Sequence, residues 1–295
     1  MQFDVIRVIR LIMETLRKRI QQIKKKRPGY KEMLDFYQKV REEQEKVRTS
    51  LTIEPIQLKK EWKALLAKEG FPLLERKDFP IDIEASLSLF KSLCQIGKEA
   101  NPHMAEQVKK IEENIDKKTI DLKAILKEGG NEQKVEGIAK ELGLDKKILL
   151  FFMHSSLKPS IETGVEQLSH EIETETWMKG HCPICGSLPY LSLLKEEVGK
   201  RFLLCSHCGY QWRIDRMICP FCNNRDQESL QFFYAEEEKT HRVDLCDKCH
   251  QYIKTIDLRT IGETDFPLED LATLHLDITA SKKGYKRPVP NPWID

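Results

Sequence analysis

Eight cysteines in four Cys-x-x-Cys pairs are the residues of this chain whose type and spacing can do chemistry. A Cys-x-x-Cys turn directs two thiolates to one point in space, and two such turns supply the four ligands of a tetrahedral metal site. Four turns therefore predict two metal ions, each in a site of four cysteines. The eight predicted ligands are Cys182, Cys185, Cys205, Cys208, Cys219, Cys222, Cys246 and Cys249.

The four pairs belong to an internal repeat. Cys182-Pro-Ile-Cys185 and Cys219-Pro-Phe-Cys222 each precede a short alternating segment that leads into the next Cys-x-x-Cys turn. Interleaved pairing of the turns is conceivable, but each copy is complete in itself and resembles a zinc-ribbon or rubredoxin-like module. We therefore expect the first four cysteines to bind one metal ion and the last four to bind the other.

The spacing does not identify the metal, because zinc and iron both accept four thiolates in a tetrahedron. Structural zinc is the preferred interpretation. Iron in a rubredoxin-like site could carry one electron, and an iron–sulfur cluster is a third alternative. Closed sulfur coordination leaves no position for water, so Lewis-acid catalysis is not expected. Each module is too small to bury a sufficient core, so the metal should supply on the order of 10 kcal/mol of its folding free energy.

The thiols could instead form disulfides in a secreted protein, but they are confined to one short part of the chain. Phe3–Ile23 is interrupted by Arg7, Arg10 and Glu14 and lacks the apolar centre of a signal peptide. The longest apolar stretch, Ile148–Met153, is too short to span a bilayer. We expect a protein of the reducing cytoplasm that holds its metals through thiolates and does not insert into membranes.

Charge and motifs exclude two broad functions. The chain carries 49 basic and 47 acidic residues, a net charge of +2. Residues 177–260 contain twelve basic and eleven acidic residues, and the run Glu236–Glu238 would repel phosphate. A nucleic-acid-binding zinc ribbon is therefore disfavoured. No phosphate-binding loop, nucleophile elbow or His-Glu-x-x-His motif occurs, so we do not expect an enzyme.

The part of the chain that precedes the cysteines has the three- and four-residue apolar spacing of helices. Basic residues Lys24–Arg27 end the first helix, where cations suit the helix dipole; a nucleic-acid or lipid patch is the alternative. Cys94 lies on an apolar helix face and is expected to be a buried thiol. The predicted helices are Phe3–Ile23, Tyr30–Arg48, Leu58–Glu69, one starting near Asp82, His103–Lys127, Glu132–Leu142 with Gly143 as its C-cap, Ile148–Leu157 ended by Pro159, and Ile161–Trp177.

The predicted fold class is α+β, with an all-helical N-terminal domain followed by two tandem zinc-ribbon or rubredoxin-like β modules. The domain boundaries are 1–176 for the helical domain, 177–217 and 218–260 for the two four-cysteine modules, and 261–295 for a C-terminal tail whose short helix packs on the rest.

Other residues of the modules have two interpretations each. Trp212, Arg213 and Arg216 could form an aromatic–arginine contact patch for a protein partner, or could combine strand packing with solvated charge. The histidines beside the cysteine turns could replace a cysteine as ligand, but four cysteines per metal leave them in supporting or solvated positions. These histidines are His181, His207 and His250.

With these residues in view, the chain resembles the FdhE family, the accessory proteins of formate dehydrogenase. The resemblance covers roughly residues 60–295 and is specific in the metal region. It rests on the motifs Trp177-x-x-Gly180-x-Cys182-Pro-Ile-Cys185-Gly-Ser-x-Pro189, Arg201-x-Leu-x-Cys205-Ser-x-Cys208, and Arg242-x-x-x-Cys246-Asp-x-Cys249-x-x-Tyr252-x-Lys254.

The resemblance implies a cytoplasmic maturation factor with a helical domain and two rubredoxin-like modules that bind zinc or iron. It implies that the partner is the catalytic subunit of a molybdenum- or tungsten-dependent formate dehydrogenase. Our hypothesis is a chaperone that uses the metal modules as a rigid surface to bind this partly matured subunit. The alternatives are an iron-containing redox protein or oxygen sensor and, less favoured, a zinc-ribbon nucleic-acid binder.

Overall fold

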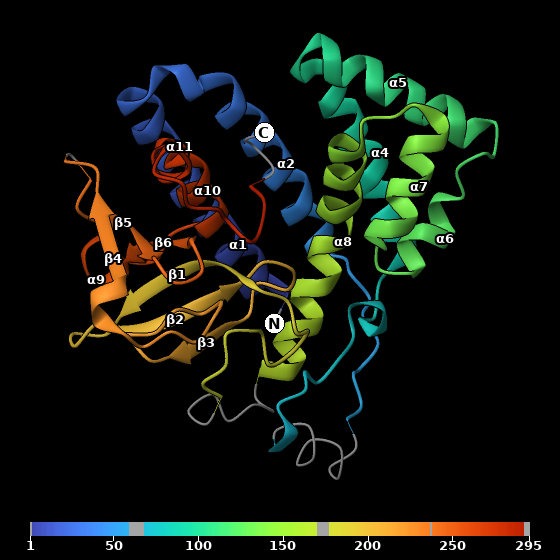
Figure 1. The fold of residues 1–295 in the computed structure, drawn as a ribbon. Helices are drawn as coiled ribbons and strands as arrows, with labels where there is room; N and C mark the ends of the chain where they lie inside the picture. Colours follow the sequence, from blue (N-terminus) through green and yellow to red (C-terminus); the bar gives the residue numbers. More distant parts are fainter. Residues whose placement is uncertain (1, 59–67, 170–176, 237, 292–295) are drawn as a thin grey trace. The chain divides into compact units, whose positions relative to one another are not determined.

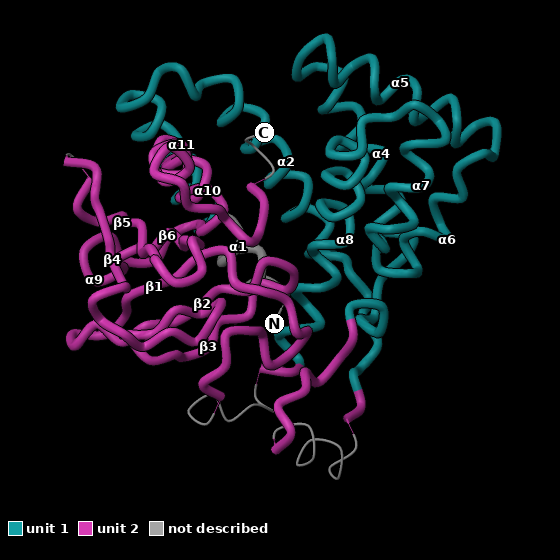
Figure 2. The backbone as a smooth tube through the Cα atoms, viewed as in Figure 1, with its two compact units in different colours: residues 1–56, 76–167 teal, residues 57–75, 168–295 magenta. Residues whose placement is uncertain are grey.

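The structure, a computed structural model, describes residues 2–58, 68–169, 177–236 and 238–291. These residues form two compact units (Figure 2). Unit 1 comprises residues 1–56 and 76–167, and unit 2 comprises residues 57–75 and 168–295. This division differs from the predicted boundary after residue 176, because residues 57–75 group with the cysteine modules and not with the helices.

The regular secondary structure of unit 1 is helical in its described residues, as predicted. Asp82 caps one helix by accepting a hydrogen bond from the Ala85 N–H at 3.0 Å, and Gly143 ends another in the left-handed conformation, with φ 62°. The helices of Figure 1 are α1 (Gln2–Lys26), α2 (Lys31–Arg48), α4 (Ile83–Ala100), α5 (Pro102–Asp116), α6 (Leu122–Lys127), α7 (Glu132–Leu142) and α8 (Lys146–Leu168).

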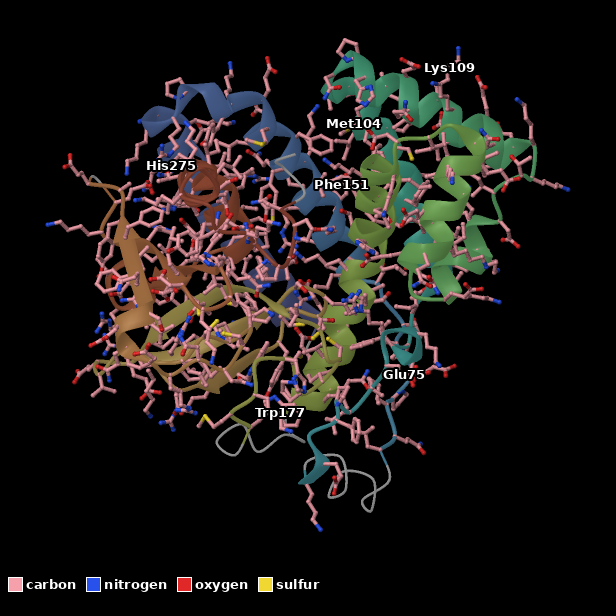
Figure 3. All side chains as sticks on the ribbon, viewed as in Figure 1. Glu75, Met104, Lys109, Phe151, Trp177 and His275 are labelled. Atoms are coloured by element: carbon pink, nitrogen blue, oxygen red, sulfur yellow. The ribbon has the colours of Figure 1, made fainter. Side chains whose placement is uncertain are left out.

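Aromatic side chains of α2, α4 and α8 form part of the core of unit 1. Phe90 and Phe152 are at most 1% exposed and meet edge to face, with their ring centroids 6.1 Å apart. Phe151, labelled in Figure 3, lies 5.5 Å from Phe36 between ring centroids. Cys94 is buried on α4, as predicted, and burial raises the pKa of its thiol to about 12. The Cys94 thiol is therefore a packing group and not a nucleophile.

The prediction that Pro159 ends a helix is wrong, because α8 continues through it. Proline has no N–H, so the carbonyl of Ser155, four residues earlier, loses its helical donor. The buried Gln44 of α2 replaces that donor: its Nε2 donates to the Ser155 carbonyl at 2.8 Å. The two predicted helices are therefore one, joined by a hydrogen bond from a distant part of the chain.

The predicted helix His103–Lys127 is wrong in a different way, because α5 and α6 are separate. Between them Lys118 takes a positive φ of 58°, which a helix does not tolerate. The Asn114 carbonyl accepts hydrogen bonds there from the N–H and the hydroxyl of Thr119, which replace helical bonds. The local turn therefore competes successfully with the helical pattern.

Two other predicted helices fall partly outside the described residues. Of Leu58–Glu69, residue 58 is not helical and residues 68 and 69 are, while 59–67 lie outside the description. Of Ile161–Trp177, residues 170–176 lie outside it. No helix in the part of the chain that the structure describes combines the length and apolarity needed to cross a membrane.

We predict that Gln44→Ala lowers the free energy of unfolding by about 1–2 kcal/mol, because it leaves a buried carbonyl without a donor. In a Pro159→Ala background the loss should be smaller, since the restored backbone N–H at position 159 can reach the Ser155 carbonyl. Urea unfolding of the four proteins, followed by the helical circular dichroism signal, measures both effects. An equal loss in the two backgrounds would show that Gln44 does not compensate for the proline.

Unit 2 contains one six-stranded sheet with the strand order β3-β2-β1-β6-β5-β4 (Figure 1). Each predicted module supplies three antiparallel strands, and the central pair, β1 and β6, runs parallel. The modules therefore repeat head to tail within a single sheet. The strands are β1 (Pro189–Lys195), β2 (Lys200–Cys205), β3 (Gln211–Ile214), β4 (Leu230–Tyr234), β5 (His241–Cys246) and β6 (Gln251–Asp257).

The predicted C-terminal tail is an integral layer on this sheet. It contains α10 (Phe266–Ala272) and α11 (Leu274–Lys282), after the short α9 (Leu258–Ile261), in place of the single short helix expected. Leu276 and Ala280 of α11 pack with the β5 and β6 side chains Val243, Leu245 and Tyr252. One face of the β5–β6 region is thereby covered.

A buried network of charges fastens this layer to β6. Lys254 Nζ lies 2.7 Å from an Asp270 oxygen and 2.6 Å from an Asp277 oxygen, and Arg287 bonds the same two carboxylates at 2.9 and 3.0 Å. Lys254, Asp270 and Asp277 are each at most 5% exposed. Burial alone would raise the pKa of Asp270, but Arg287 and Lys254 hold it below its usual range. Two cations thus compensate two carboxylates.

We predict that Lys254→Met destabilises unit 2 by about 3–5 kcal/mol, because two buried carboxylates would then share one cation. The exposed Lys282 of α11 offers the matched control: Lys282→Met should change stability by less than about 0.5 kcal/mol. Urea midpoints and the rate of proteolysis within residues 282–286 measure the effect. Equal midpoints for the two variants would mean that the network contributes nothing.

Candidate metal centres

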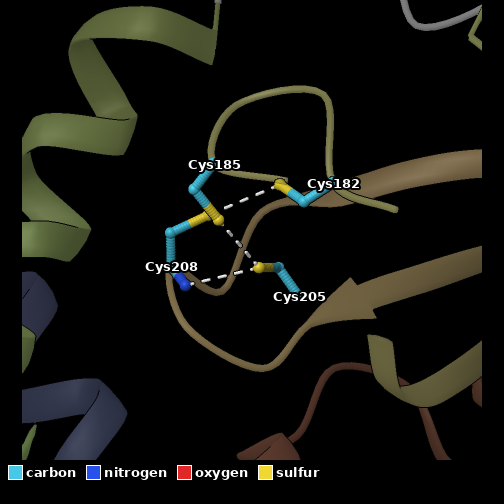
Figure 4. A group of neighbouring side chains, drawn as sticks. All are labelled: Cys182, Cys185, Cys205 and Cys208. Carbon is cyan, nitrogen blue, oxygen red and sulfur yellow. Dashed lines mark hydrogen bonds between the residues drawn. The ribbon is translucent and has the colours of Figure 1, made fainter. Parts of the chain in front are cut away.

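The first cluster gathers the sulfur atoms of Cys182, Cys185, Cys205 and Cys208 (Figure 4). Three of its sulfur pairs are 3.4, 3.6 and 3.6 Å apart, and all four residues are buried. Four sulfurs about 2.3 Å from a metal ion would be separated by about 3.8 Å, whereas a disulfide bond measures about 2.05 Å. The geometry therefore fits a tetrahedral metal ion and not disulfides.

The second cluster repeats this geometry with Cys219, Cys222, Cys246 and Cys249. Its sulfur pairs Cys219–Cys249 and Cys222–Cys246 are 3.7 and 3.6 Å apart. Cys222 and Cys249 are partly exposed, in contrast to every member of the first cluster. The structure thus brings the eight predicted ligands together in the sequential pairing, but in unequal environments.

A common backbone turn presents each pair of thiols. In all four turns the N–H of the residue after the second cysteine donates to the carbonyl of the first cysteine, at 2.8–3.3 Å. That donor residue has a positive φ in every case, which suits glycine. The donors are Gly186 (71°) and Gly209 (72°) in the first module, and Asn223 (57°) and His250 (52°) in the second. The second module therefore contains non-glycine residues in a conformation that disfavours them by about 1 kcal/mol.

Hydrogen-bond donors surround the sulfur atoms as a thiolate site requires. The Cys208 N–H donates to the Cys205 sulfur at 3.4 Å. The Cys185 thiol donates to the Ser187 hydroxyl oxygen at 3.3 Å, and that hydroxyl can become the donor when the thiol ionises. In the second cluster, Asn224 Nδ2 donates to the Cys246 sulfur at 3.6 Å. Such donors stabilise negative sulfur and orient it toward a metal. Four sulfurs close the coordination sphere, so the bound ion would cross-link the two turns of its module.

Burial opposes ionisation of these thiols in the absence of a metal. It raises the pKa of Cys182 well above its ordinary value and that of Cys219 to about 11. Metal binding must therefore displace protons from both clusters, and metal affinity falls as the pH falls.

A segment from outside the modules supports the first cluster. The Leu73 and Leu74 N–H groups donate to the carbonyls of Pro183 and Ile184 at 2.9 and 2.8 Å. These two acceptors lie between the paired cysteines of the first turn, so residues 70–74 form a strand-like support along it. The contact explains why this segment belongs to unit 2.

The three histidines beside the turns are outside both clusters. His181 Nε2 lies 3.2 Å from the Gly70 carbonyl, and the His181 carbonyl accepts a hydrogen bond from Trp177 Nε1 at 2.8 Å. Trp177 is labelled in Figure 3. His181 thus links the supporting segment to the first turn, in a structural role.

The expectation that Trp212 lies on a contact surface is wrong. Its side chain is 0% exposed, and its Nε1 donates to the Lys179 carbonyl at 2.8 Å. Alternation along β3 turns Trp212 and Ile214 inward, which leaves Arg213 half-buried between them. Arg216, beyond the strand, is exposed. A partner contact therefore remains a prediction for Arg213 and Arg216 alone.

Sequence reasoning missed a buried arginine that links the two modules. Arg201 of β2 is 4% exposed and bonds Ser192, the Ile218 carbonyl and, across the module boundary, Asp244 at 3.3 Å. The signal was present in the repeat, since Arg201 and Arg242 each precede a cysteine turn by four residues. Equivalent arginines in two copies indicate a structural position.

We predict that the second cluster loses its metal first, because two of its four thiols are partly exposed. During a limited treatment of the metal-loaded protein with a chelator and N-ethylmaleimide, mass spectrometry should find label on Cys222 and Cys249 before label on the first cluster. Cys94, buried in unit 1, is the internal control and should stay unlabelled until the protein unfolds. Simultaneous labelling of both clusters would contradict the unequal exposure of the two sites.

Comparison with known proteins matches this chain to one family. The model for the FdhE central domain matches residues 181–216, and that for the FdhE C-terminal domain matches residues 203–294. The chain is 30% identical over 271 residues to the protein FdhE homolog of Aquifex aeolicus, which spans 90% of each chain. It is 29% identical over 206 residues to the homolog of Haemophilus influenzae strain PittEE, spanning 68% of this chain and 65% of that one. The crystal structure of the FdhE protein from Pseudomonas aeruginosa shares the fold, with a TM-score of 0.68 at 20% identity over 96% of this chain and 95% of that one.

Proposed function

The chain belongs to the FdhE family, and from this premise we propose that it is an accessory protein that binds the catalytic subunit of a molybdenum- or tungsten-dependent formate dehydrogenase during its maturation. Two closed four-cysteine clusters in one sheet support a binding role most directly. Closed sulfur sites offer no position at which a substrate could meet the metal. In this proposal the protein acts in the cytoplasm, where thiols stay reduced, and catalyses no reaction itself.

The metal modules would serve as a preorganised binding surface. Zinc in both clusters would fix the turns that begin and end the hairpins, and the shared sheet would hold the two modules in one orientation. A surface that is already ordered loses little conformational entropy when a partner binds. Such a surface suits a chaperone that must bind a partly matured subunit and then release it.

A second candidate function rests on the exposure of the second cluster. Iron bound by Cys219, Cys222, Cys246 and Cys249 would lie beside two partly exposed thiolates, where an electron donor could approach. Metal analysis and a visible spectrum of anaerobically purified protein separate the alternatives. Two zinc ions and no colour favour the scaffold, whereas iron with bands that bleach reversibly on reduction favours electron transfer.

We predict that the immobilised full chain, purified anaerobically, retains the catalytic subunit of formate dehydrogenase. Cys182→Ala should reduce the metal content to one ion per chain and weaken retention by about tenfold or more, because the first module loses its cross-link. Cys94→Ala is the matched control, since it removes a buried cysteine outside both clusters, and it should retain both metals and the partner.

Failure of the wild-type chain to retain the catalytic subunit would contradict the proposed function. If Cys182→Ala lost a metal but retained the subunit fully, the partner would bind elsewhere than on the metal modules.

A further inference from the structure

Strand β4 is an open edge of the sheet. Among the described strands it pairs only with β5. Its sequence, Leu-Gln-Phe-Phe-Tyr, contains neither the proline nor the lysine with which proteins protect such edges. Phe232 and Tyr234 are 56% and 43% exposed, and their rings pack edge to face with centroids 5.5 Å apart. Unpaired backbone groups and two exposed aromatic rings therefore occur on the same strand.

The equivalent edge in the first module is occupied. In the head-to-tail repeat, β4 corresponds to β1, and the edge of β1 that faces the second module pairs with β6. That pairing is parallel and runs from Leu191 opposite Lys254 to Leu194 opposite Asp257. In the first module this edge is thus paired with β6, whereas the corresponding edge of β4 has no partner strand among the described residues.

Positive charge lies directly beside the aromatic pair. Arg242 of β5 is opposite Tyr234 in the ladder, and its guanidinium lies 5.1 Å from the centroid of the Phe232 ring. Its Nε also lies 2.8 Å from Asp244, but the same carboxylate receives the buried Arg201 at 3.3 Å. One carboxylate shared by two guanidiniums leaves a positive charge uncompensated at this face.

Two further arginines extend this charge toward the β1–β2 turn. A Cβ placed on Gly199 would lie 2.9 Å from Nη1 of Arg259 and 3.6 Å from Nη1 of Arg216, so these guanidiniums converge there. Arg259 pairs with Asp257. Asp257 lies on the same face of the sheet as Arg242, because Arg242 is opposite Thr255 and side chains two residues apart on a strand share a face.

Two carboxylates, those of residues 244 and 257, lie among the guanidiniums of residues 201, 216, 242 and 259. The buried Arg201 also interacts with Cys219 of the second cluster, so the positive charge available to a partner is that of Arg216, Arg242 and Arg259.

Exposed acidic side chains lie at the borders of this face: Glu228 lies in the short 3-10 helix that directly precedes β4, and Glu197 belongs to the β1–β2 turn near Gly199. Exposed Glu236 begins the turn beyond β4, so negative charge bounds the face at that end. Neighbouring charges that are paired with each other are Glu196 with Lys200 and Asp215 with Arg225.

We propose that this face docks an extended acidic segment of a partner protein, which adds to the sheet along β4. The partner's backbone would pair with β4, its apolar side chains would cover Phe232 and Tyr234, and its carboxylates would meet Arg242 and Arg259. A second copy of this chain would bring the same excess of positive charge, so an acidic partner fits better than self-association. The identity of that partner as the formate dehydrogenase catalytic subunit rests on the proposed function.

Two variants and one matched control test the docking face with the full, metal-loaded chain. Phe232→Glu and Arg259→Glu should each weaken binding of the catalytic subunit by about tenfold or more. Leu11→Glu introduces the same charge at an apolar residue of similar exposure, 65%, on α1 of unit 1, outside the metal modules, and it should bind within about twofold of wild type. Metal content and circular dichroism confirm that all three variants are folded.

A probe independent of the partner's identity is a fluorescent peptide of alternating valine and glutamate, compared with one of alternating valine and lysine. The acidic peptide should bind the full chain in a salt-sensitive manner and slow amide exchange in residues 230–234. Equal binding of the two peptides, or no protection of these amides, would overturn the docking face. So would a wild-type dimer that Phe232→Glu dissociates, because the occupant would then be a second copy.

The binding and peptide experiments distinguish a failure of the proposed function from a failure of the docking face. A catalytic subunit that does not bind wild-type protein contradicts the proposed function, while the peptides still decide whether β4 accepts an acidic strand. A subunit that binds Phe232→Glu and Arg259→Glu as tightly as wild type leaves the proposed function intact and removes β4 as its site.

Discussion

The convergence of four sulfur atoms in each module is the constraint on which unit 2 depends. Each convergence requires two backbone turns, and each turn requires a residue in the left-handed conformation immediately after its second cysteine. Burial raises the pKa of Cys182 and Cys219 and so opposes their ionisation in the absence of a metal. A metal ion bound by all four sulfurs would cross-link both ends of a short hairpin and so favour one register of the strands between them. Parallel pairing of β1 with β6 and the Arg201–Asp244 contact then combine two small modules into one sheet.

The two clusters are chemically identical but physically different. Glycine in both turns, full burial and the backbone bonds from Leu73 and Leu74 all support the first cluster. The second has Asn223 and His250 in the strained turn positions and two thiols in contact with solvent. Its second turn leads directly into β6, and its first turn leads to β4 through residues 223–229. The more exposed cluster thus lies in the module that also carries the exposed aromatic edge.

The sequence was sufficient where local chemistry decides the structure. Cysteine spacing predicted the ligands and their pairing, and Asp82 and Gly143 predicted helix ends, because a cap or a turn is specified by adjacent residues. It failed where a distant residue decides. Pro159 breaks an isolated helix, but Gln44 supplies the missing donor from a segment more than a hundred residues away. Trp212 was predicted to contact a partner, but its indole N–H donates to the Lys179 carbonyl, an acceptor more than thirty residues earlier in the chain. Lys254 carried no sign of burial, since its carboxylate partners lie on helices beyond the strand.

Residues 70–74 have a consequence for how the protein can be made and divided. About a hundred residues, most of them in the helical unit, separate this segment from the first cysteine turn. It nevertheless forms backbone hydrogen bonds along that turn. A fragment that begins at residue 177 would contain all eight cysteines and lack the supporting segment. On the ribosome, the supporting segment emerges long before the cysteines that it contacts. The metal-binding unit is therefore discontinuous in sequence, and its first site can mature only after the intervening helices have been synthesised.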